Sequence, residues 1–145
     1  MSRGFTMVEM LLSIAVIALI TAISIPVYQQ FQTRNNLDIT TSNVVQSLRR
    51  AMIFSQADKA GDWWSVRILP DQVVIYKGIT FGLRDTSYDE SIEIPKGITP
   101  SGMNNISFRR VSGVPFTTDL KPIVLTSYSN ETRTITINEK GTISY

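Results

Sequence analysis

Hydrophobic residues are concentrated at the start of the chain. From Phe5 to Val27 there are 23 residues with a single ionisable side chain, Glu9. At a rise of about 1.5 Å per residue, a helix of this length is roughly 35 Å long, which is enough to cross a hydrocarbon core of about 30 Å. The pattern therefore predicts a transmembrane helix over residues 5–28.

The helical pattern continues beyond the apolar segment, but on one face only. Apolar residues recur at close to helical spacing at Leu37, Val44, Val45, Leu48, Ala51 and Met52. Arg34, Arg49 and Arg50 fall largely outside this stripe, which favours a solvated helix face over a nucleic-acid contact. We expect residues 29–60 to form the amphipathic second half of one long helix, which ends near Gly61.

Beyond Gly61, apolar and polar residues alternate with a period of two, which is typical of β-strands. The expected strands cover residues 64–69, 72–77, 91–94, 106–111, 123–128, 132–138 and 142–145. Pro70-Asp71 predicts a hairpin between the first two strands, and Asn138-Glu139-Lys140-Gly141 suits a hairpin between the last two. The predicted fold class is α+β, with the long N-terminal helix packed on an antiparallel sheet or sandwich formed by residues 61–145.

The composition narrows the chemistry that this domain can perform. The 145 residues include no cysteine and no histidine, which excludes disulfides, thiolate metal sites, thiol nucleophiles and histidine bases. Fourteen Lys and Arg residues against twelve Asp and Glu give a net charge of +2, without the basic stripe of a nucleic-acid binder. We therefore expect no enzyme activity and no cofactor, and consider DNA an improbable partner.

Glu9 is the unusual residue of the apolar segment. A carboxylate well inside a bilayer costs on the order of 2.5–3.5 kcal/mol on insertion scales, so it usually has a partner. The nearest upstream cation, Arg3, lies outside the apolar run. A cleaved secretory signal fits poorly, because the run exceeds the usual apolar core of about 7–15 residues and Ala22-Ile23-Ser24 is a poor cleavage site. A plain anchor leaves Glu9 unexplained.

The stretch Arg3-Gly4-Phe5-Thr6-Met7-Val8-Glu9 resembles the processing site of type IV pilins and of the related pseudopilins of type II secretion. The resemblance implies that a prepilin peptidase removes residues 1–4 by cutting after Gly4 and methylates the new amine of Phe5. Met7 is a small departure, because the family often has leucine there. The cleavage would create a cation, the α-ammonium group of Phe5, with which Glu9 can pair.

Two geometries are open for this pair. Phe5 and Glu9 are four residues apart, so the carboxylate can meet the amine of its own helix. The family resemblance implies instead the amine of a neighbouring subunit in a growing filament. It also implies pilin or pseudopilin subunits, an inner-membrane assembly platform and membrane lipid as partners, in the cytoplasmic membrane and then in an extracytoplasmic filament. Pro26, where many family members have proline, is expected to kink the helix, either incidentally or as a flexible point.

The C-terminal part, from about Val45 to Tyr145, resembles the GspH group of minor pseudopilins and its minor-pilin relatives. This weaker resemblance is carried by Ser47-Leu48-Arg49-Arg50-Ala51, by the tryptophan-rich first strand and by the closing Thr132-Arg133-Thr134-Ile135-Thr136-Ile137-Asn138 with Gly141. It implies either a structural filament subunit or a tip subunit whose β domain binds DNA, a surface or a secreted cargo.

Three smaller groups of residues allow a functional interpretation beside a structural one. Asp85, Asp89 and Glu90 lie in an expected loop over residues 84–90 and could bind calcium, although a solvated polar loop is favoured. Arg109 and Arg110 could contact DNA or another ligand, but neighbouring residues on a strand point to opposite faces.

The third group is the pair Trp63-Trp64. We expect one of the two rings in the core and the other half-exposed beside it, rather than a platform for a sugar.

Overall fold

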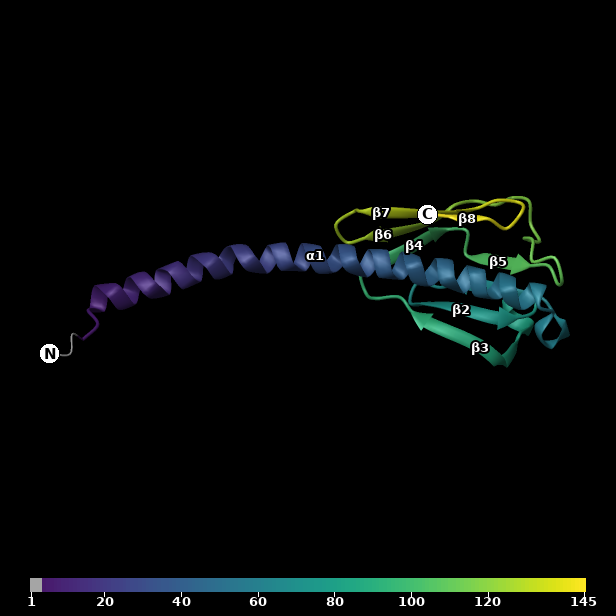
Figure 1. Ribbon diagram of the computed structural model, residues 1–145, viewed down its shortest axis with the longest axis horizontal. Helices are drawn as coiled ribbons and strands as arrows, with labels where there is room; N and C mark the ends of the chain where they lie inside the picture. Colours follow the sequence, from purple (N-terminus) through teal and green to yellow (C-terminus); the bar gives the residue numbers. More distant parts are fainter. Residues whose placement is uncertain (1–3) are drawn as a thin grey trace.

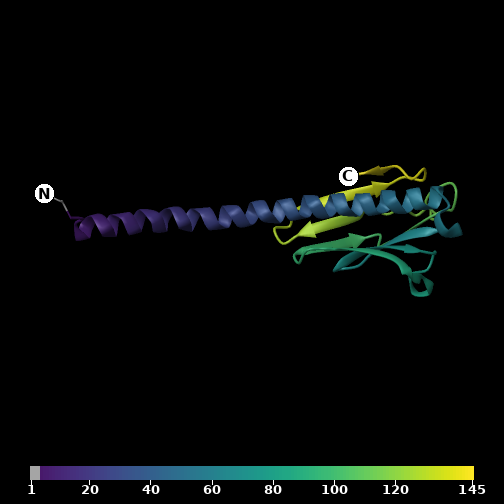
Figure 2. The ribbon, with the colours of Figure 1, turned by 60° about the horizontal axis from the view of Figure 1, so that its bottom comes forward.

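The computed structural model describes residues 4–145, and the side chains within that range except those of residues 23–26. One long helix, α1 (Met7–Gln56), is followed by two four-stranded antiparallel sheets. The first half of α1 projects away from the β domain, and the second half runs along both sheets (Figures 1 and 2). The predicted α+β class and the single long helix are confirmed, and the helix has 50 residues. The kink expected at Pro26 lies outside the residues whose side chains are described.

The helix begins and ends at identifiable caps. Thr6 is the N-cap residue, in an extended conformation, and its hydroxyl accepts a hydrogen bond from the backbone N–H of Glu9. At the other end, the N–H of Ala57 donates to the carbonyl of Ile53, and Asp58 adopts a left-handed conformation with φ of 52°. The helix therefore ends before the expected stop at Gly61, which belongs instead to the short 3-10 helix η1 (Lys59–Gly61).

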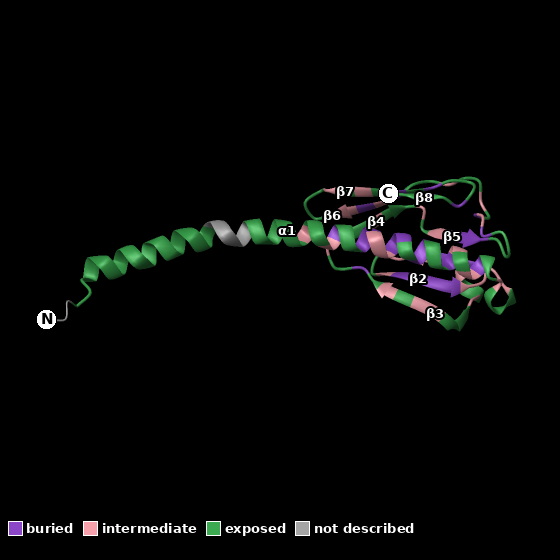
Figure 3. Ribbon diagram, in the orientation of Figure 1, coloured by how far each residue is buried: buried purple, intermediate pink, exposed green. Residues whose placement is uncertain are grey.

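The two halves of α1 have opposite surroundings (Figure 3). The described residues of the first half are exposed along the whole circumference. The second half buries one stripe, formed by Leu37, Thr40, Thr41, Val44, Val45, Ser47, Leu48, Ala51 and Ser55. The amphipathic spacing read from the sequence thus gives the face that packs on the β domain.

The first sheet has the strand order β3-β2-β1-β5. Its strands are β1 (Trp64–Ile68), β2 (Gln72–Lys77), β3 (Asp85–Glu93) and β5 (Asn105–Phe108), and the 3-10 helix η2 (Phe81–Leu83) lies between β2 and β3. Strands β1 and β2 form the expected hairpin, closed by a hydrogen bond from the N–H of Leu69 to the carbonyl of Gln72. Trp64, Val66 and Ile68 of β1 point into the core.

The second sheet has the order β4-β6-β7-β8, with strands β4 (Ile98–Gly102), β6 (Ile123–Ser127), β7 (Thr132–Ile137) and β8 (Ile143–Ser144). The last two strands form the expected hairpin through Asn138 and Gly141, and Gly141 has a φ of +84°. Leu125, Ile123 and Ile135 join the helix stripe and the first sheet in one hydrophobic core.

Two edge strands differ from the sequence-based expectation. All but the first residue of the expected loop over residues 84–90 is part of strand β3, which pairs with β2 from Gln72↔Glu93 to Lys77↔Asp85. Strand β4 was not expected, because it contains Pro100 and ends at Gly102. Both are edge strands, where charged side chains and proline are tolerated because one side of the backbone needs no ladder partner.

Strand β5 ends at Phe108, earlier than the expected strand over residues 106–111. The chain turns back after Phe108, with the N–H of Gly113 donating to the carbonyl of Arg109 and the N–H of Arg109 donating to that of Val114. Val111 has a φ of +68°, which is incompatible with a strand. Arg109 and Arg110 therefore lie in a turn at the end of the domain farthest from the N-terminus of α1.

Candidate functional site

Glu9 closes the start of α1 together with Thr6. The carboxylate Oε2 accepts a hydrogen bond from the N–H of Thr6 at 3.5 Å, and the Thr6 hydroxyl accepts one from the N–H of Glu9 at 3.3 Å. This reciprocal arrangement is a capping box, which satisfies two N–H groups that have no partner inside the helix. It also places the negative charge at the positive end of the helix dipole. Glu9 therefore has a backbone partner in the chain with its leader still attached.

The part that Thr6 plays in capping the helix was not predicted. A signal for it was present, because Thr6-Met7-Val8-Glu9 has the Thr-x-x-Glu spacing of a capping box directly before an apolar run. The resemblance drew attention to Gly4, Phe5 and Glu9 as a processing site instead. Phe5 lies before the first helical residue with 75% of its surface exposed, and Gly4 is exposed as well. The bond expected to be cut is thus accessible on the described side of the motif.

The first half of α1 presents a continuous apolar surface. Its large side chains are exposed by about half or more, including Met7 at 81%, Val8 at 75% and Leu19 at 67%. The helix is long and apolar enough to cross a membrane. An apolar surface of this size is far larger than the patches of an ordinary soluble domain and indicates contact with lipid or with other apolar helices.

Two hydroxyl groups among the described side chains of this half are satisfied within the helix. Ser13 Oγ donates to the carbonyl of Glu9 and Thr21 Oγ1 donates to that of Ile17, each at 2.8 Å. Such bonds allow serine and threonine to lie in hydrocarbon without an unpaired donor. Among the described residues of the apolar segment, Glu9 is therefore the ionisable one whose presence in hydrocarbon needs an explanation.

Ion pairs connect the second half of α1 to both sheets. Arg34 pairs with Glu131 at 2.7 Å and Asp38 with Arg133 at 2.8 Å, both on the side of β7. Arg50 pairs with Glu90 of β3 at 2.6 Å. Exposed pairs of this kind contribute at most about 1 kcal/mol each, so the buried stripe supplies most of the adhesion. The ion pairs instead favour one position of the helix along the strands, because each arginine meets its acidic partner only in that register.

Arg110 has an acidic partner, whereas Arg109 contacts a ring. The guanidinium of Arg110 binds both carboxylate oxygens of Asp58, with Nη2 at 2.8 Å from Oδ2. The hydrogen bond from Arg110 and its charge lower the pKa of Asp58, and the same contact raises the pKa of Arg110. The guanidinium carbon of Arg109 lies 5.6 Å from the centre of the Phe116 ring. The two arginines thus do not form one basic patch.

The three carboxylates considered for calcium have separate partners. Asp85 accepts hydrogen bonds from the hydroxyl and the N–H of Ser87, which lower its pKa. Asp89 pairs with Arg84 at 2.8 Å, and Glu90 is bound to α1. Asp89 and Glu90 point to opposite faces of β3, because they are neighbours on a strand. Among the described residues, no group of three or more carboxylate, histidine or cysteine side chains lies close enough to hold a metal ion.

The tryptophan pair divides as expected. Trp64 is 1% exposed and donates through its ring N–H to the carbonyl of Lys59. Trp63 is half-buried, with its ring 5.1 Å from that of Phe116 in an edge-to-face arrangement. Trp63, Arg109 and Phe116 are therefore close together at the end of the domain farthest from the apolar half of α1.

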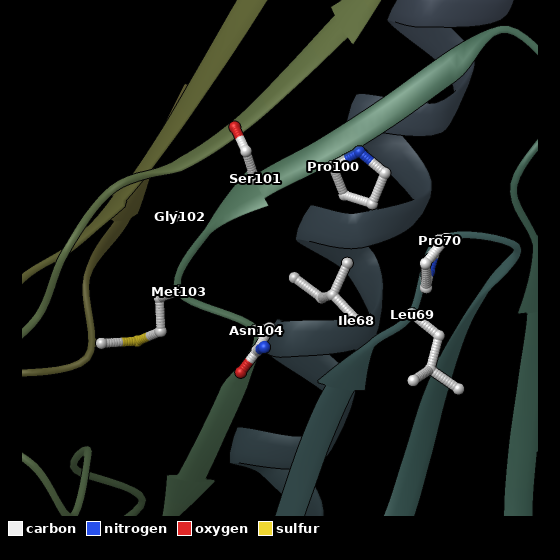
Figure 4. Close-up of a pocket in the computed structure, with 8 residues that line it drawn as sticks. All are labelled: Ile68, Leu69, Pro70, Pro100, Ser101, Gly102, Met103 and Asn104. Carbon is white, nitrogen blue, oxygen red and sulfur yellow. The ribbon is translucent and has the colours of Figure 1, made fainter.

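A small hollow lies between β4 and the end of β1 (Figure 4). Its volume is about 150 Å³, and its polar side chains are those of Ser101 and Asn104. Pockets for small molecules usually measure about 300–1,000 Å³. The hollow is too small for most metabolites, and its lining contains no ionisable side chain.

Comparison with known protein families gives a match for the start of the chain. Residues 1–25 match the family model described as the prokaryotic N-terminal methylation motif. No curated protein and no solved structure matches the chain. The resemblance to type IV pilins and pseudopilins is confirmed in the segment that carries the motif, whereas the likeness of residues 45–145 to the GspH group stays a prediction.

Proposed function

Because its first 25 residues carry the N-terminal methylation motif, we propose that the chain is a structural subunit of a type IV pilus or type II secretion filament. It is made as an inner-membrane precursor, cut between Gly4 and Phe5, methylated at Phe5 and assembled through its apolar helix. The motif carries this proposal, and the exposed apolar half of α1, continuous with a half that is fixed to a β domain, supports it.

The apolar half provides the assembly surface. In the membrane this surface is covered by lipid, and in a filament it is covered by the same segment of other subunits. Lipid tails are as apolar as leucine, so close side-chain packing and interhelical contacts, rather than escape from water, drive the association. The β domain stays at the outside of such a bundle, because the ion pairs and the buried stripe hold it to the second half of α1.

Glu9 supplies the negative charge of a charge match, the pairing of its carboxylate with the ammonium group that cleavage creates on Phe5. Its carboxylate already lies beside the N–H of Thr6, one residue from the amine that cleavage would create on Phe5. That ammonium group can replace the backbone N–H as the partner, either within one chain or from an incoming subunit. The intermolecular pair explains why an acidic side chain is kept in a segment destined for hydrocarbon.

The intact mass of protein extracted from membranes and from filaments tests the proposal. The expected mass lacks Met1 to Gly4 and includes one methyl group. A chain that polymerises normally with Met1 in place, or a free globule cut beyond Ser24, would contradict it. Comparing the mass of the protein in membranes with its mass in filaments distinguishes processing, which the motif predicts, from assembly.

The aromatic surface at the far end of the domain favours a second candidate. Trp63, Phe116 and Arg109 are residue types enriched where proteins bind partners, and they lie opposite the membrane anchor. A subunit at the filament tip would present this surface to a secreted cargo, a surface or DNA. Counting subunits in purified filaments with a bound antibody distinguishes the two roles. Labelling along the whole length indicates the structural role, and labelling at one end indicates the tip role.

A further inference from the structure

The turn between β6 and β7 lies beside α1 where the helix leaves the β domain (Figures 1 and 2). The ion pair of 2.7 Å between Arg34 and Glu131 fixes this contact. The segment between β3 and β4 reaches the same end, because the ring of Tyr128 lies against Gly97. These two segments form the part of the domain that is nearest to the apolar half of the helix.

Helix geometry gives the height of this end above the membrane. Arg34 lies about 10 Å along the axis from Val27, the last residue of the apolar run, and about 4.5 Å from Phe31. The headgroup layer on each side of a bilayer is about 5–7 Å thick. With Val27 at the edge of the hydrocarbon core, an anchored chain holds the β6–β7 turn about 3–5 Å beyond the headgroups. A tilt of the helix toward the turn, about 20° on average, brings the turn closer to them.

The side chains at this height are those of a membrane interface. Tyr28 and Phe31 on the helix are 70% and 68% exposed, and Tyr128 in the turn is 80% exposed. Aromatic rings, tyrosine and tryptophan above all, are enriched at headgroup depth, where the apolar ring and the polar group each find a suitable environment. Lys96 is also exposed at this end and makes no ion pair within the described part of the chain.

Tyr128 has a dedicated support. A Cβ atom on Gly97 would lie 2.1 Å from a carbon of the Tyr128 ring, so the ring can occupy this position only because residue 97 has no side chain. Gly97 has a φ of +100°, which brings the two segments together at this point. One side of the ring thus packs against the backbone at Gly97, and the rest of the ring is exposed to solvent.

The charges at this end nearly balance. Arg34 pairs with Glu131. Lys96 makes no ion pair among the described residues, and an exposed acidic residue, Asp71, lies at the same end, because its backbone carbonyl accepts a hydrogen bond from the N–H of Ile94. Without a net positive patch, attraction to anionic lipid contributes little. Burial of the aromatic rings in the interface provides the favourable term instead.

We infer that Tyr28, Phe31, Lys96 and Tyr128 form an interfacial collar that rests on the headgroup layer of the membrane while the subunit awaits assembly. The inference depends on the anchored orientation in the proposed function, and it adds a second contact between the β domain and lipid. The collar limits the tilt of the domain, so that the stored subunit keeps one orientation relative to the membrane.

The absence of cysteine allows a direct test in the full chain. A nitroxide label on Ser129→Cys, next to Tyr128, reports contact with lipid in vesicles of phosphatidylcholine. A label on Ser112→Cys, exposed in the turn at the far end, serves as the reference. We expect the label at 129 to be protected from a water-soluble relaxing agent and accessible to oxygen, and the label at 112 to be open to the water-soluble agent.

A second substitution in the labelled chain tests whether Tyr128 causes the protection of the label at 129. Tyr128→Ala is expected to abolish the protection at 129, and Tyr128→Trp to retain it. Tyr145→Ala is the matched control, because Tyr145 is also exposed, at 69%, but lies outside the collar. Equal accessibility at 129 and 112, or protection that survives Tyr128→Ala, would overturn the inference.

Two further results would also count against the collar. Protection that appears only after phosphatidylglycerol is added would indicate a charge contact, and protection that depends on the ratio of protein to lipid would indicate a second copy of the chain. The measurement uses the unprocessed chain in vesicles, so it does not depend on cleavage or polymerisation. Failure of the proposed function, read from mass and filaments, is therefore distinguishable from failure of the collar.

Discussion

The hydroxyl of Ser55, near the end of α1, donates a hydrogen bond to the backbone carbonyl of Phe108, at the end of β5, over 3.1 Å. The same hydroxyl accepts one from the N–H of Trp64 at 3.0 Å, at the start of β1. A single buried side chain thus joins the helix to two neighbouring strands. The end of α1 is fixed by this polar contact as well as by hydrophobic packing.

Replacing Ser55 by alanine is expected to destabilise the domain by about 1–3 kcal/mol, because a buried N–H and a buried carbonyl would each lose a partner. Denaturant unfolding of the detergent-solubilised chain, followed by tryptophan fluorescence, measures the difference. Ser144→Ala, at an exposed position of β8, is the control and should leave the midpoint almost unchanged. Equal stability of both variants would contradict the role given to Ser55.

The cap and the charge at the start of α1 can be separated by substitution. Glu9→Gln removes the charge and is expected to stop incorporation into filaments, while expression and cleavage continue. Thr6→Ala removes one half of the capping box, at a cost of about 1 kcal/mol to the helix, and keeps the charge. Filament yield and precursor processing, measured on the same cultures, check both.

Glu139→Gln, in the exposed turn before β8, controls for the loss of a carboxylate elsewhere. Normal filaments from the Glu9→Gln variant would refute the charge match. Loss of filaments from Thr6→Ala with no change for Glu9→Gln would assign the effect to the cap.

Gly102, at the end of β4, is expected to tolerate no side chain. It has a φ of +84°, and an added Cβ would lie 2.1 Å from the carbonyl oxygen of Pro122. Gly102→Ala should therefore destabilise the domain by about 1–3 kcal/mol through backbone strain, with the steric clash adding to this. Gly82→Ala, where a Cβ would meet nothing within 4 Å, is the matched control. Thermal unfolding of the two variants provides the comparison.

The pair formed by Asp58 and Arg110 predicts a dependence on pH. The folded-state pKa of Asp58 lies below the ordinary value of 3.8, so the pair stabilises the fold above that value and loses its effect as the pH falls through the lowered pKa. The melting temperature of Arg110→Gln should lie below that of the wild type near neutral pH, and the difference should shrink below about pH 4.

Arg109→Gln is the control for this prediction, because Arg109 contacts the Phe116 ring rather than a carboxylate. Its difference from the wild type should be the same across this range of pH. The raised pKa of Arg110 moves its own titration further above any pH at which the fold is measured, so it adds no second transition. A constant difference between Arg110→Gln and the wild type down to pH 3 would contradict the prediction.

The elements with strong periodicity were predictable from the sequence. The apolar run and the stripe at Leu37, Val44 and Leu48 define α1, and the alternation around Val66 and Ile75 defines the hairpin of β1 and β2. The stripe and the alternation are reliable because each corresponds to a face buried against the core, and the apolar run is reliable because of its length. The start of α1 was predictable as a processing motif, and the part of Glu9 in capping was available from its spacing to Thr6.

The edge elements were not predictable, because tertiary context decides them. Strand β3 is rich in acidic residues, which have low strand propensity, and it forms because β2 offers an unpaired edge. Strand β4 forms through Pro100 because that residue lies on the open side of the sheet. The end of β5 at Phe108 depends on the turn that brings Arg110 to Asp58, a contact that the local sequence does not reveal.

The ion pairs and the buried stripe along the second half of α1 also have a mechanical consequence. When a force pulls along the helix axis, the side-chain contacts between α1 and the β domain are loaded in shear, and the load is shared over several helical turns. The strands lie beside the helix and do not carry the tension themselves. Tension along the helix therefore does not act directly on the hydrogen bonds between the strands, and the β domain can stay folded while the helix bears the force.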